Sequence, residues 1–88
     1  MIRSKDFIKR KIGTQYVIVA VGAATKRFNG MISVNGTGSF IWDALAEETT
    51  LDELVGKITD TYDVDADTAR AHAEAFLTTL KEAGALAE

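Results

Sequence analysis

The stretch FNGMISVNGTGSFIWDAL, from Phe28 to Leu45, contains a change of period that decides how the chain folds. Its first part predicts a β-strand over residues 28–34, because side chains at alternate positions of a strand lie on opposite faces. One face carries Phe28, Ile32 and Val34, and the other carries Asn29, Met31 and Ser33. From residue 37 onward the apolar residues follow a helical period, so the strand is expected to pass directly into a helix.

The corner between this strand and this helix is rich in glycine. Asn35-Gly36 is typical of a turn, because both residue types tolerate a positive φ, and we expect Gly36 to adopt a conformation that a side chain disfavours. Thr37 or Ser39 is then expected to cap the helix that carries Phe40, Ile41, Trp42 and Leu45. The corner also invites comparison with phosphate-binding loops, but neither the dinucleotide fingerprint nor the Walker lysine pattern is present.

The residues before this stretch predict two more strands. Residues 7–12 form the first, with Ile8 and Ile12 on one face, and Gly13-Thr14 marks the turn that follows. Tyr16 to Val21 is rich in β-branched residues, which suits a central strand. A loop over residues 22–27 then leads to the strand at 28–34. Three strands joined by short connections predict an antiparallel meander in which the third strand is an edge.

The residues after the corner predict two further helices. Thr50 with Glu53 three positions later forms a capping box, and Val64-Asp65 is a second start signal. Gly84 stands where a helix commonly ends. The apolar stripe of the second helix is Leu51, Leu54, Val55, Ile58 and Tyr62, and that of the third is Ala69, Ala73, Phe76, Leu77, Leu80 and Ala83. Three strands followed by three helices predict one α+β domain over residues 1–88, arranged like a winged helix.

The composition restricts the possible chemistry. Apolar residues make up 47% of the chain and charged residues 26%, as in ordinary globular proteins. Cysteine is absent and His72 is the single histidine, so disulfides, thiolate sites and histidine-rich metal sites are excluded. The longest apolar run is too short to span a bilayer, and no signal peptide is indicated. We therefore expect a cytoplasmic protein that does not bind membranes.

Charge is distributed unevenly along the chain. Residues 1–27 hold seven basic residues and one acidic residue, whereas residues 28–88 hold three basic and twelve acidic residues. The simpler interpretation is two solvated faces of opposite sign. The other is electrostatic steering, in which the basic part attracts an acidic partner and the association rate falls as salt is added.

Neither a metal site nor a catalytic group stands out. Asp63, Asp65, Asp67 and Glu74 match ligand positions of a calcium loop, but Thr68 occupies the position that requires glycine. These acids are better explained by the N-terminus of a helix, where the helix dipole favours negative charge. His72 has no nucleophile or carboxylate tied to it by sequence. We expect no metal, no cofactor and no enzymatic activity.

Several of these residues together carry a resemblance to a known family. They are Val34-Asn35 after a strand, Ile41-Trp42 and Leu45, Thr50-Leu51, Leu54-Val55, Tyr62, Phe76-Leu77, Leu80 and Gly84. The pattern resembles the PqqD family, the stand-alone domains that recognise ribosomally made, modified peptides, including the peptide of PQQ biosynthesis. The resemblance is clearest from Phe28 to Leu86, and the Asp-Gly often found between the first two helices of the family is replaced here by Glu47-Glu48-Thr49.

The resemblance implies a non-catalytic protein that captures a leader peptide as an added strand on its third strand. The groove would be closed by the third helix, and the peptide would be presented to a modifying enzyme such as a radical SAM protein. An unpaired edge without proline suits such strand addition. The candidate peptide-binding residues are Asn29, Met31, Ile32, Ser33, Val34, Arg70, Ala73, Glu74, Leu77 and Lys81. Leu77 lies at the margin of the stripe and fits either the groove wall or the core.

A winged-helix DNA-binding regulator is the alternative function. Its recognition helix would come from residues 37–83, which carry the acidic excess, whereas contacts to phosphate require Lys and Arg. We therefore expect no nucleic-acid partner. The expected partners are a precursor peptide and its modifying enzyme, and the protein itself is expected to be a monomer or a weak homodimer.

Overall fold

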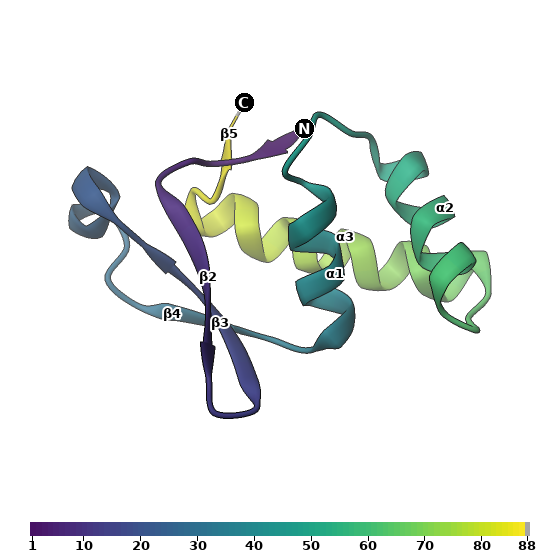
Figure 1. The fold of residues 1–88 in the computed structure, drawn as a ribbon. Helices are drawn as coiled ribbons and strands as arrows, with labels where there is room; N and C mark the ends of the chain where they lie inside the picture. The colour runs from purple at the N-terminus through teal and green to yellow at the C-terminus, as the bar shows by residue number, and fades with distance from the viewer. Residues whose placement is uncertain (88) are drawn as a thin grey trace.

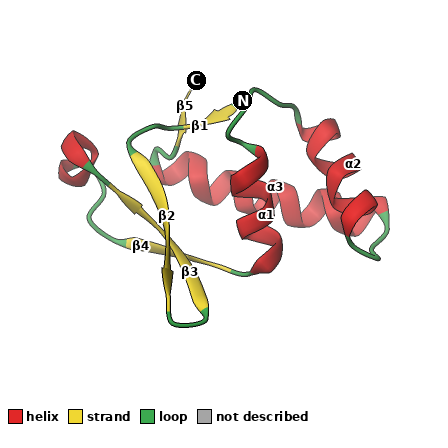
Figure 2. Cartoon of the chain, in the orientation of Figure 1, coloured by secondary structure: helices red, strands yellow, loops and turns green. Residues whose placement is uncertain are grey.

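A computed structural model describes residues 1–87 and confirms the α+β fold: a three-stranded antiparallel sheet is followed by three helices (Figure 1). The helices pack on one side of the sheet (Figure 2). The strands of the sheet are β2 (Phe7–Ile12), β3 (Gln15–Ala20) and β4 (Met31–Val34). The helices are α1 (Gly36–Ala44), α2 (Leu51–Thr61) and α3 (Ala66–Ala83), and a short 3-10 helix, η1 (Gly22–Lys26), lies in the segment predicted as a loop.

The sheet is the predicted meander, in the order β2-β3-β4. Gly13 makes the β2–β3 turn with a φ of 63°, a conformation that favours glycine. Ile18 of β3 is fully buried, and it pairs with Lys9 on one side and with Ile32 on the other. The central position of β3 leaves β4 as an edge strand, since no other strand within residues 1–87 pairs with it.

The third strand is shorter than predicted, because β4 begins at Met31 rather than at Phe28. The amide of Phe28 donates to the carbonyl of Ala24 at 2.9 Å, which ties this part of the chain to η1 and removes that amide from the β-ladder. The ring of Phe28 packs against that of Phe7 instead, with their centroids 5.8 Å apart. Asn29 therefore precedes the strand and is not one of its residues.

The strand-to-helix corner lies where the sequence predicts, but the predicted cap of the helix and the predicted conformation of Gly36 are wrong. Asn35 caps α1, because its Oδ1 accepts from the amide of Gly38 at 2.8 Å, whereas Thr37 and Ser39 lie inside the helix. Gly36 has no positive φ, and an added Cβ would meet nothing within 4 Å. Gly38 is the crowded glycine, because a Cβ there would lie 3.3 Å from each of three neighbouring atoms.

The other two helices begin where the sequence predicts. Thr50 caps α2, since its Oγ1 accepts from the amide of Glu53 at 3.2 Å. Asp65 caps α3 by accepting from the amide of Thr68 at 2.7 Å. This backbone hydrogen bond, together with one from the Thr68 hydroxyl, lowers the pKa of the Asp65 carboxyl below its ordinary value. Gly84 ends α3 in the left-handed conformation, with a φ of 79°.

The two ends of the chain form a ribbon that sequence periodicity did not reveal. β1 (Ile2–Arg3) pairs antiparallel with β5 (Leu86–Ala87), and the N- and C-terminal segments lie side by side in Figure 1. Arg3 is fixed further by its guanidinium, which lies 5.3 Å from the centroid of the Trp42 ring and donates to the Trp42 carbonyl. Two-residue strands so far apart in sequence have no periodic signal of their own.

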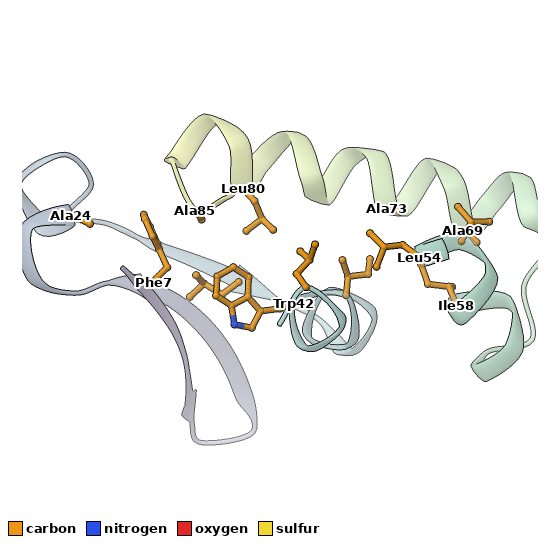
Figure 3. Close-up of a cluster of buried hydrophobic side chains, with 13 residues drawn as sticks. Phe7, Ala24, Trp42, Leu54, Ile58, Ala69, Ala73, Leu80 and Ala85 are labelled. Atoms are coloured by element: carbon orange, nitrogen blue, oxygen red, sulfur yellow. The ribbon is translucent and has the colours of Figure 1, made fainter. Parts of the chain in front are cut away.

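The core has two parts (Figure 3). In the first, Phe7 of β2, Trp42 of α1 and Leu80 of α3 lie near one another. In the second, Leu54 and Ile58 of α2 face the fully buried Ala69 and Ala73 of α3. The small alanine side chains allow α2 and α3 to approach closely. Residues 1–87 include no helix with the length and apolar character needed to cross a membrane.

Candidate functional site

A groove runs along the unpaired edge of β4 and is closed on its other side by α3. It consists of two cavities that meet at Thr79. The first, of about 290 Å³, is lined by residues that include Ser33, Asn35, Gly38, His72, Phe76 and Thr79. The second, of about 400 Å³, is lined by Phe28, Met31, Ile32, Thr79, Glu82 and Ala83. The two cavities thus follow β4 from end to end.

The wall formed by β4 offers main-chain groups and no charge. Ile32 and Val34 are half-buried and pack against the core, whereas Met31 and Ser33 are exposed on the opposite face. All four residues are uncharged, and β4 contains no proline. Lysine, proline and bulges are the usual devices that prevent an edge strand from pairing with another chain, and β4 carries neither of the first two.

The wall formed by α3 comes from one flank of its apolar stripe. His72, Phe76, Thr79 and Ala83 follow each other at helical spacing along this flank. Phe76 reaches the first turn of α1, and the missing side chain of Gly38 makes room for its ring. The floor of the groove is therefore apolar, and its rim carries hydroxyl, amide and imidazole groups together with the carboxylate of Glu82.

The candidate residues predicted on the third helix do not line this groove. Glu74, Leu77 and Lys81 occupy the opposite flank of α3, where they border a separate cavity with Met1 and Leu86. Leu77 is half-buried because it packs against the core, next to the ribbon of the two chain ends. Of the two alternatives left open for Leu77, its packing agrees with the core and not with a groove wall beside β4.

The two remaining predicted helix residues also lie elsewhere. Arg70 points to α2 and donates to Asp52 at 2.6 Å, a hydrogen bond that raises the pKa of its guanidinium. Ala73 is fully buried in the core. Of the residues predicted on the third strand, Met31, Ile32, Ser33 and Val34 form β4 and Asn29 precedes it. The residues that line the groove but were not among the predicted candidates are Phe28, Asn35, Thr37, Gly38, Ile41, His72, Ala75, Phe76, Thr79, Glu82 and Ala83.

The basic residues of the N-terminal part lie mostly away from the groove. Arg10 and Lys11 belong to β2, which is separated from β4 by β3. Lys9 faces α1 and is already paired, since its Nζ donates to Ser39 and to Asp43 at 2.7 Å each. Lys26 and Arg27 are the cations that immediately precede the groove segment at Phe28. Steering of an acidic peptide therefore stays a prediction.

The side chains gathered in the groove suit binding rather than bond-making chemistry. No three metal-ligating side chains cluster anywhere in the part of the chain described, residues 1–87. A recognition helix for DNA has no support either. The cations of α3 are Arg70, which is paired with Asp52, and Lys81, which lies on the flank away from β4. An exposed strand edge beside an apolar floor is the arrangement that accepts an extended peptide.

Comparisons with known proteins agree with this description. Residues 15–86 match the family model described as coenzyme PQQ synthesis protein D (PqqD). A solved structure, described as TbiB1 in complex with the TbiA(beta) leader peptide, superposes with a TM-score of 0.76. The two proteins share 24% sequence identity, and the match covers 98% of this chain and 94% of TbiB1. A search of curated proteins gave no significant match.

Proposed function

The chain belongs to the PqqD family, a family of non-catalytic peptide-binding proteins, and on that premise we propose that it captures the leader segment of a ribosomally made precursor peptide. The peptide is added to the sheet as a fourth strand on the free edge of β4. TbiB1, which has the same fold, was solved with a leader peptide bound.

The observation that carries this proposal is the coincidence of the unpaired β4 edge with the groove. A new strand lies about 4.8 Å from its neighbour in a sheet, so a peptide on this edge enters the space between β4 and α3. Its side chains opposite Ile32 and Val34 point to the same face as those residues, which is the face covered by α3. Main-chain hydrogen bonds then contribute affinity, and the two cavities contribute selectivity.

The role that follows for the protein is presentation of the peptide. A bound leader segment is held in one register, while the rest of the precursor extends beyond the ends of β4 and remains accessible. We propose that this remainder is delivered to a modifying enzyme, of which a radical SAM protein is the type implied by the family resemblance. The groove supports this separation of peptide binding from peptide modification, because the residues that line it suit binding and include no catalytic arrangement.

The proposal can be tested without knowing the natural peptide. Random peptides are selected for binding by mRNA display, and an enriched peptide is added to ¹⁵N-labelled protein while amide chemical shifts are recorded. We expect shifts in β4 and along the His72–Ala83 flank of α3, and no saturable binding of a DNA duplex. Failure to enrich any peptide, or shifts confined to β2 and α2, would show that the proposal is wrong.

A further inference from the structure

The face of the sheet that points away from the helices carries a row of apolar side chains. Ile8, Val19 and Met31 pair in register across the three strands. None of the three belongs to the core or packs against it, whereas their neighbours Phe7, Ile18 and Ile32 do. The row is therefore on the outer face of the sheet, and it ends at Met31, beside the free edge of β4.

One residue of this outer face is buried. Val17, which lies in the next row, is only 5% exposed although it stands outside the main core cluster. Its cross-strand partners are Arg10 and Ser33. Met31 is 64% exposed because it has a neighbour on one side only. The row of Ile8, Val19 and Met31 thus lacks a fourth member at the position where an added strand would supply it.

We propose that Met31 is a specificity-determining residue, which selects an apolar side chain of the bound peptide on the outer face of the sheet. The inference rests on the proposed function, because the side chain it selects belongs to the strand added to β4. Residues opposite each other in a sheet share one face, so the peptide residue opposite Met31 extends the row instead of entering the groove. The row itself contains no charged or hydrogen-bonding side chain to favour a polar residue there.

The outer face therefore contributes to peptide selectivity in addition to the groove, and Met31 belongs to both, because it also borders the second cavity. The two cavities select the peptide side chains that face α3. The row ending at Met31 selects one of the peptide side chains that point to the outer face of the sheet. A peptide suited to this protein therefore carries an apolar residue on each face of its strand. A cross-strand apolar pair of this kind changes affinity by about fivefold at most.

The test repeats the peptide selection with wild-type protein, with Met31→Lys and with Ile12→Lys. Ile12 is the matched control: it is 55% exposed on the same face, but it lies on β2, at the opposite edge of the sheet. Both substitutions replace an exposed apolar residue by lysine, and circular dichroism verifies that each variant is folded. The peptide position opposite Met31 is identified by nuclear Overhauser contacts to the Met31 methyl group.

Wild-type protein and Ile12→Lys are expected to enrich an apolar residue at that position, whereas Met31→Lys enriches an acidic one. Met31→Glu should give the reciprocal preference for a basic residue, and the peptide positions that face the first cavity should be unchanged because Met31 does not border it. The inference is overturned if the position opposite Met31 shows no preference, or if the preference survives both Met31 substitutions. That result leaves the proposed function standing, whereas failure to enrich any peptide on wild-type protein refutes the proposed function itself.

Discussion

The ring of Phe76 lies so close to the backbone of Gly38 that a Cβ at Gly38 would come 3.3 Å from Cε1 of the ring. The same Cβ would also lie 3.3 Å from Cβ of Val34, the last residue of β4. Gly38 is thus the point at which the edge strand, the first turn of α1 and the groove wall of α3 meet. The shape of the groove depends on this contact.

The first prediction concerns the two glycines of the corner. Gly38→Val places atoms where Val34 and Phe76 already pack, so we expect the free energy of unfolding to fall by about 1–3 kcal/mol. Gly36→Ala is the matched control. It adds a methyl group in open space at a helical position, so it should raise that free energy by about 0.4–1 kcal/mol. Thermal or chemical denaturation measures both, and equal effects at the two positions would contradict the role of Gly38.

The second prediction concerns the edge of β4. Proline removes an amide donor and its ring obstructs an adjoining strand, so a proline on the free side of β4 should abolish peptide binding. Backbone groups of Met31 and Ser33 point to one side of the strand, and those of Ile32 and Val34 point to the other. We expect Ser33→Pro to remove binding of the selected peptide, whereas Ser33→Ala, which keeps the amide, retains it.

Fluorescence anisotropy of a labelled peptide measures this binding, and circular dichroism serves as the folding control. If Ser33→Pro unfolds the domain, its amide belongs to the β3 ladder, and Ile32→Pro then becomes the variant that should block the free edge. Strand addition on β4 is refuted if Ser33→Pro and Ile32→Pro are both folded and both bind peptide as tightly as wild-type protein.

The third prediction separates the two flanks of α3. Thr78 and Thr79 are both exposed, but Thr79 lines both cavities of the groove and Thr78 lines the cavity beside Leu77. Thr79→Asp places a charge at the centre of the groove, so peptide affinity should fall at least tenfold without a comparable loss of stability. Thr78→Asp should bind peptide like wild-type protein. If Thr78→Asp is the more damaging change, the groove has been assigned to the wrong flank.

The fourth prediction concerns pH. The pKa of Asp65 in the folded protein lies below its ordinary value of 3.8, because the carboxylate accepts hydrogen bonds from Thr68. A lowered pKa means that the carboxylate stabilises the fold at neutral pH, and that this contribution disappears as the pH falls below about 4. Asp65→Ala removes the cap and should therefore lower the melting temperature at pH 7, and the difference from wild type should shrink in acid. Asp63→Ala removes a charge without removing the cap, so a similar profile for that variant would contradict the assignment.

The local sequence predicted most of the elements because their signals act over a few residues. The caps at Thr50 and Asp65 each need a hydrogen bond to an amide three positions away, and the glycine at 84 needs only its own φ. The β-branched residues between Tyr16 and Val21 likewise favour a strand through their own local preference. The cap of α1 was missed because Asn35, Thr37 and Ser39 are all competent caps, and their sequence does not show that the helix already begins at Gly36.

The groove could not be located from the sequence alone, because an apolar stripe on a helix has two flanks that local rules do not distinguish. Leu77 made one flank more apolar, and the prediction chose it. In the structure that residue packs against the core and borders a cavity with Met1 and Leu86, beside the ribbon of Ile2–Arg3 with Leu86–Ala87, a pairing across the whole chain that periodicity cannot reveal.

What the sequence determined by itself was the order of the elements, the meander and the edge position of its third strand, since these follow from periodicity, turn chemistry and short connections. Tertiary structure alone decided where that strand begins and which flank of α3 faces it. Both depend on contacts between segments distant in sequence: the amide of Phe28 bonded to Ala24, and the ring of Phe76 packed on Gly38. Such contacts form only when the sheet and the helices pack together, and the groove is the space that this packing leaves open.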